Sequence, residues 1–139
     1  MLHYKIYQNK NKKAKGYGKY YGRVVINQTL TLDQLAEHMA NHNTPYSKGA
    51  IYGVLTDMVK CIHELVLDGN AVKIPNLAII SAGIKTTAAD AAGKFSAANI
   101  LSVHLRARPA GSFSRAELSK AARTRQIGTY YSDKSTNES

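Results

Sequence analysis

Residues 48–67 carry apolar side chains at the spacing of one long amphipathic helix, and the width of this apolar stripe restricts how the chain can fold. Ser47 is suited to cap the helix, and Gly69 suits the left-handed position that ends it. The stripe consists of Ile51, Val54, Leu55, Met58, Val59, Ile62, Leu65 and Val66, and is widened by Tyr52. At 100° per residue it spans about 140°, more than one short neighbouring helix can cover. A homodimer interface is therefore expected to cover the remainder.

Two shorter helices are predicted from their capping residues. Thr31 and Gln34 have the spacing of a capping box, and the helix they open should end near residues 41–44. Ser114 and Glu117 have the same spacing before a run of good helix formers near the C-terminus. The chain therefore has a helical pair in its first half and a separate helix late in the sequence.

Alternating patterns predict the strands. Residues 2–8 and 20–26 should form an antiparallel pair. A strand over residues 72–85, interrupted near its proline, and a strand over residues 100–108 enclose a loop or flexible arm at residues 86–98. On the last strand one face is apolar, and the other carries Ser102, His104, Arg106 and Arg108. The sequence thus predicts an α+β fold with one basic, exposed strand face.

The positive charge is concentrated in two segments. The chain has 139 residues, enough for one domain or a small domain with tails, and a net charge of +10. Residues 1–23 contribute +7 without any acid, residues 24–105 contribute −1, and residues 106–125 contribute +5. This segregation favours a polyanionic partner, and a nucleic acid above all, because each neutralised phosphate releases counterions.

Several classes of protein are disfavoured. No run of 18 apolar residues predicts a membrane helix, and the first residues lack the apolar core of a signal peptide. The single cysteine excludes an internal disulfide framework and suits a reducing cytosol. No catalytic motif is present, and His38 and His42, four residues apart, are weak support for a metal. We expect no enzymatic activity, no metal, no cofactor, no small-molecule substrate and no membrane partner.

Residues 30–111 resemble the bacterial histone-like HU/IHF DNA-binding proteins. The likeness lies in Leu32–Met39, in the helix end Leu65–Asn70, in Val72–Ala78 at the place of the family's V-x-(I/L)-P-G-F-G, and in Arg108–Gly111, which reads R-P-A-G. Asn, Leu and Ala stand here where the family has Gly, Phe and Gly. The extra N-terminal strands and the long C-terminus look more like the HU-like proteins of Bacteroides-type bacteria than minimal HU.

The resemblance implies an HU/IHF-like architecture. Two N-terminal helices would form the dimer core, beside an antiparallel sheet with a β-arm and a C-terminal helix, plus the additional N-terminal strand pair. It divides the chain into a basic strand extension packed on the core (residues 1–29), an HU-like DNA-binding domain (30–125) and a polar, disordered tail (126–139). The function implied is architectural: a cytoplasmic, nucleoid-associated homodimer that binds and condenses double-stranded DNA without strong sequence preference, through a basic saddle and arms reaching the minor groove.

The resemblance also implies site residues. The expected DNA-binding residues are Lys73, Ser81, Lys85, Lys94, His104, Arg106, Arg108, Arg115, Lys120, Arg123 and Arg125. The expected dimer interface consists of Ile51, Leu55, Met58, Val59, Ile62 and Val66.

The arm favours a second hypothesis. Family arms commonly carry a proline that wedges between base pairs, but residues 86–98 contain no proline and only one large apolar residue, Phe95. The alternative is an HU-like dimerisation or protein-interaction module with weak or no DNA binding. RNA binding is a third reading, because net charge does not distinguish the nucleic acids.

Overall fold

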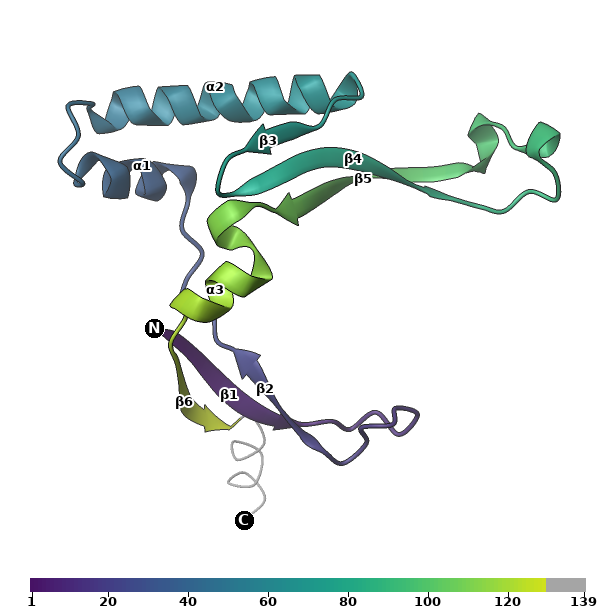
Figure 1. Ribbon diagram of the computed structural model, residues 1–139, viewed down its shortest axis with the longest axis horizontal. Coiled ribbons are helices and arrows are strands. Elements are labelled where there is room, and N and C mark those ends of the chain that lie inside the picture. The colour runs from purple at the N-terminus through teal and green to yellow at the C-terminus, as the bar shows by residue number, and fades with distance from the viewer. Residues whose placement is uncertain (130–139) are drawn as a thin grey trace, which may run out of the picture. The chain divides into compact units, whose positions relative to one another are not determined.

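The computed structural model describes residues 1–129 and divides into two compact units (Figure 1). The central unit is Leu30–Leu118. The terminal unit combines Met1–Thr29 with the chain from Ser119 onward. The mixed α+β composition is confirmed. The residues from Ser119 to 125, which the sequence places with the central residues, group with the N-terminal strands in this division.

The helical pair of the central unit begins where the capping residues predict. Helix α1 spans Leu32–Ala40, and both hydrogen bonds of the Thr31–Gln34 capping box are present. Helix α2 spans Lys48–Leu67, and the Ser47 hydroxyl accepts from the amide of Ala50. These caps satisfy amides that the first helical turn leaves without partners.

Lys48 joins the two helices on their polar side. Its ammonium lies 3.1 Å from a carboxylate oxygen of Asp33 and 3.9 Å from one of Glu37. The hydrogen bond to Asp33 and the charges of both acids raise the pKa of Lys48 above its ordinary value. The three side chains are exposed, so this ion pair orients the helices more than it stabilises them.

The sheet of the central unit has the order β3-β4-β5, with antiparallel neighbours. Its strands are β3 (Val72–Ile74), β4 (Ala78–Thr86) and β5 (Ile100–Pro109). Two short 3₁₀ turns, η1 (Ala92–Lys94) and η2 (Ala97–Asn99), close the far end of the β4–β5 arm. After β5 the chain continues through η3 (Gly111–Phe113) into α3 (Arg115–Ala121).

The end of the arm is held by hydrogen bonds although it lacks proline. The amide of Thr87 donates to the Asn99 carbonyl at 2.8 Å, and the Asn99 side chain donates to the Thr87 hydroxyl at 2.9 Å. Ser96 and Asn99 form a small capping box around η2. Hydrogen bonds therefore give the arm tip a defined conformation.

Asn76 has a backbone conformation that favours glycine. Its φ is +60°, in the left-handed region that asparagine tolerates better than most residues. Gly111, also at positive φ, lies against it so closely that the Asn76 side chain occupies the place of a Gly111 Cβ. The Ser112 hydroxyl donates to the Asn76 carbonyl and connects η3 to this turn.

Asn76→Ala is expected to lower the free energy of unfolding by about 1 kcal/mol, because alanine adopts the left-handed region at a cost. Asn76→Gly is the matched control and should leave stability nearly unchanged, since glycine adopts that region freely. Urea unfolding of both variants measures the difference. Equal stability of the two variants would contradict the role given to this backbone conformation.

The terminal unit is a three-stranded sheet with the order β2-β1-β6. Strands β1 (Leu2–Gln8) and β2 (Tyr20–Val24) form the predicted antiparallel pair. Strand β6 (Thr124–Thr129) runs parallel to β1 on its other edge. Residues 126–129, the start of the segment expected to be a disordered tail, thus form part of this strand. Residues 130–139 lie outside the described part of the chain.

The chain by itself buries few apolar side chains. Among residues 1–129, only Ala36 and Ile51 are buried hydrophobic residues. Val54, Val59, Val103 and Leu105 are exposed by 53–71%. Apolar surface of this extent is typical of an interface that a partner covers.

Candidate functional site

The two faces of the β3-β4-β5 sheet differ in chemistry. Residues opposite each other on paired strands point to the same face. Ser81 pairs with Arg106, Gly83 with His104, and Lys85 with Ser102. Ile79 lies between Arg108 on one side and Lys73 on the other. One face, called here the basic face, therefore carries Lys73, Ser81, Lys85, His104, Arg106 and Arg108.

Gly83 makes room for two side chains of the basic face. A Cβ at this position would lie 2.6 Å from Cδ of Arg106 and 2.7 Å from Nε2 of His104. Both side chains therefore lie over the β4 backbone at Gly83. Sequence reasoning missed Gly83, although a glycine inside an alternating strand pattern is a signal of close approach.

A polar hollow of about 480 Å³ lies beside these residues. Ile79, Ser81, Arg106 and Arg108 are among the residues that line it. Both arginines are exposed. The hollow therefore presents two guanidinium groups, which bind phosphate oxygens in a fork geometry.

The remaining predicted binding residues do not share the basic face. Lys94 lies on η1 at the arm tip, and Arg115 is the first residue of α3. Lys120, Arg123 and Arg125 belong to the terminal unit. The structure thus gathers six of the predicted residues on one surface and distributes the other five.

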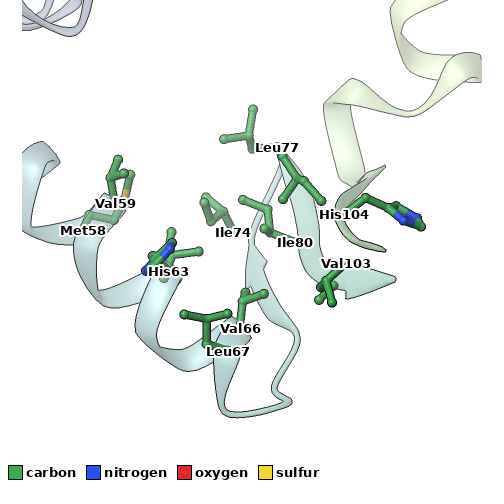
Figure 2. A pocket seen from close by; sticks show the side chains of 13 residues that line it. Met58, Val59, His63, Val66, Leu67, Ile74, Leu77, Ile80, Val103 and His104 are labelled. Carbon is green, nitrogen blue, oxygen red and sulfur yellow. The ribbon is translucent and has the colours of Figure 1, made fainter. Parts of the chain in front are cut away.

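The opposite face of the sheet forms an apolar hollow with α2 (Figure 2). Its volume is about 490 Å³. Four predicted interface residues line it: Met58, Val59, Ile62 and Val66. Ile80, Val103 and Leu105 contribute from the sheet. Figure 2 shows the His104 ring pointing away from this group, in agreement with its place on the basic face.

The other two predicted interface residues, Ile51 and Leu55, line a second apolar hollow of about 410 Å³. Met39 and Tyr46 also line this hollow, near the turn between α1 and α2. The six residues predicted for the interface therefore line two hollows along α2, both open at the surface of the single chain.

His38, in the last turn of α1, and His42, in the turn after it, place their Nε2 atoms 3.0 Å apart. No group of three or more potential metal ligands occurs among residues 1–129. Within the same residues, no helix has the length and hydropathy that crossing a bilayer demands.

A family model described as "HU domain fused to wHTH, Ig, or Glycine-rich motif" matches residues 1–125. A crystal structure described as "Putative bacterial DNA binding protein", from Bacteroides vulgatus ATCC 8482, is similar with a TM-score of 0.68 at 13% identity. The likeness covers 92% of this chain and 48% of that one, so this chain spans about half of that neighbour's length. At this identity the likeness concerns the fold. No curated protein matches the chain.

Proposed function

The chain belongs to the HU-HIG family, in which an HU domain is fused to a wHTH, Ig or glycine-rich motif, and from this we propose that it binds double-stranded DNA as an architectural homodimer. The observation that carries the proposal is the basic face of the central sheet, where Arg106 and Arg108 project beside a polar hollow. The fold neighbour described as a DNA-binding protein supports the same partner.

The basic face suits the DNA backbone better than base edges. Its cations are spread along two strands, and no set of amide side chains is arranged to read bases. Arginine and lysine contacts to phosphate fix position without reading sequence. We therefore propose binding with little sequence preference, with Lys94 at the arm tip extending the contact. A protein of this kind would compact DNA in the bacterial nucleoid, and its place would be the cytoplasm.

The homodimer proposal rests on uncovered apolar surface. The hollow lined by Met58, Val59 and Ile62 lies between a helix and a sheet of the same unit, and exposed apolar residues border it. A symmetric second copy would offer the same surface in return, as isologous interfaces require. Pairing would also place two basic faces in one particle.

The test is duplex DNA affinity at several salt concentrations, with oligomeric state measured in parallel by sedimentation equilibrium. We expect a dimer whose logarithmic affinity falls steeply with the logarithm of salt concentration, by about 0.9 per phosphate contacted. A monomer would contradict the assembly. A dimer without measurable affinity at low salt would contradict the DNA-binding proposal and leave the assembly standing.

Gly83→Ala is expected to weaken DNA binding several-fold while leaving the fold intact. The added methyl group would meet Arg106 and His104 and push both from their place over β4. Gly53→Ala, the same substitution on an exposed position of α2, is the control, because a Cβ there would meet no atom within 4 Å. Electrophoretic mobility shifts measure the affinity. Equal affinity of Gly83→Ala and the unchanged chain would show that the arrangement over Gly83 does not matter for binding.

The central unit has one property that favours the protein-interaction alternative. Residues 30–118 contain eight basic and seven acidic residues, a net charge of only +1. A module that forms dimers without binding DNA would need no larger positive charge than this. The salt titration separates the two functions, and competition between duplex DNA and structured RNA separates DNA from RNA binding.

A further inference from the structure

Nearly all the net charge of the protein lies in the terminal unit. Its described residues, 1–29 and 119–129, contain ten lysines and arginines and no aspartate or glutamate. The proposed DNA-binding function of the central unit does not use these residues. Ten cations without an acid in 40 residues repel one another, and this repulsion is relieved when a polyanion binds.

The register of the terminal sheet places cations and aromatic rings together on one face. Lys5 pairs with Arg23, and Tyr7 pairs with Tyr21. On the other edge His3 pairs with Arg125. Cross-strand partners share a face. We call this surface, made of His3, Lys5, Tyr7, Tyr21, Arg23 and Arg125, the terminal-sheet face.

Arg23 is held in position over an aromatic ring. Its guanidinium lies 4.5 Å from the centroid of the Tyr7 ring, within the range of a cation–π contact. The Tyr7 and Tyr21 rings are 5.9 Å apart and tilted by 31°. The planar guanidinium is thus oriented in advance, so less conformational entropy is lost when it binds an anion.

The loop between β1 and β2 presents five more cations in a defined conformation. It carries Lys10, Lys12, Lys13, Lys15 and Lys19. Its backbone is closed by hydrogen bonds from Gly18 to Asn9 at 2.8 Å and from Tyr17 to Ala14 at 3.1 Å. The Tyr21 hydroxyl lies where a side chain at Gly16 would be, so this tyrosine packs under the loop. The loop and the terminal-sheet face are therefore joined through Tyr21.

We propose that the terminal unit is a second DNA-binding site, in which the lysine loop and the terminal-sheet face hold the phosphate backbone of a duplex. The choice of duplex DNA rests on the proposed function of the central unit. An anionic membrane is less suited, because the cations lie on a sheet and a loop with tyrosines among them, and not on a helix with an apolar face to insert. One chain would then contact DNA through two separate surfaces.

The test is a double-mutant cycle on the full chain. Lys12→Gln/Lys13→Gln removes two charges from the loop, and Arg106→Ala/Arg108→Ala removes two charges from the basic face. Affinity for a duplex is measured from low to moderate salt for each double variant and for their combination. Lys60→Gln, on an exposed position of α2, is the single-charge control, and circular dichroism confirms that each variant is folded.

The loop variant is expected to lower duplex affinity by about tenfold at low salt and to reduce the salt slope by about 1.8 for each chain of the dimer that contacts the duplex. The combined variant should show the sum of the two losses, as independent sites require. A loss for the basic-face variant alone would overturn the second site and leave the proposed function intact. A loss for the loop variant alone would overturn the proposed function of the basic face and support the second site.

A competition experiment with vesicles that contain anionic phospholipid distinguishes DNA from a membrane surface as the partner of the terminal unit. If the terminal unit binds DNA, excess vesicles should not displace the duplex from the Arg106→Ala/Arg108→Ala variant. Displacement by vesicles, together with unchanged duplex affinity of the loop variant, would assign the terminal unit to a membrane surface and overturn the proposal.

Discussion

Replacing Arg106 and Arg108 with alanine is expected to lower the affinity for duplex DNA by about tenfold or more at low salt, and to reduce the salt slope by about 1.8. The two arginines lie on the same face of β5, exposed, beside the same polar hollow. Each guanidinium can bind a phosphate in a bidentate fork. These values count the two arginines of one chain. In the proposed homodimer the substitutions remove four guanidinium groups, so the loss of affinity and the change in salt slope would both be larger.

The variant Arg106→Lys/Arg108→Lys separates the effect of the positive charge from that of the guanidinium geometry. Lysine keeps the charge but not the fork, so this variant should retain the salt slope and lose only part of the affinity. Mobility shifts at matched salt concentrations measure both quantities. Two results would contradict the assignment: full affinity in the alanine variant, or a loss in the alanine variant that leaves the salt slope unchanged.

Val59→Asp is expected to abolish the homodimer at concentrations where the unchanged chain is dimeric. Val59 is 53% exposed and lines the apolar hollow between α2 and the sheet. An unpaired charge buried in an interface costs about 3–5 kcal/mol, and symmetry introduces it twice. The dissociation constant should rise by at least about a hundredfold. DNA affinity should fall with it, because two linked basic faces bind more tightly than one.

Lys60→Gln is the matched control, because it makes the same change in net charge on the neighbouring, polar side of α2. It should leave the oligomeric state unchanged in sedimentation equilibrium. Val59→Ala tests the same interface without a buried charge and should weaken the dimer less. A dimer that persists in Val59→Asp, with its affinity unchanged, would place the interface elsewhere on the molecule.

The elements fixed by local chemistry could be predicted from the sequence. The Thr31–Gln34 box and the Ser47 cap act within four residues, and both are present where the pattern predicts them. The alternation along residues 100–108 likewise predicted which side chains share the basic face. In both cases the determining interactions lie within a short window of the chain.

Features that depend on distant residues were missed. Residues 124–129 read T-R-Q-I-G-T, a polar segment whose strand forms against β1 at the other end of the sequence. This pairing places Arg123 and Arg125 in the terminal unit, whereas the sequence groups them with the residues before them. The need for glycine at position 83 comes from side chains on the neighbouring strand. Short sequence windows contain neither kind of information.

The pairing of Leu2 with Thr124 has a consequence for the order of folding. During synthesis β1 leaves the ribosome first, but its parallel partner emerges only after the whole central unit. Contacts between such distant residues form slowly, because closing a long loop costs entropy before the contact stabilises anything. The central unit can therefore acquire its structure during translation, while the sheet of the terminal unit is completed last. Until then one edge of β1 stays open to other strands, and aggregation during synthesis would begin there.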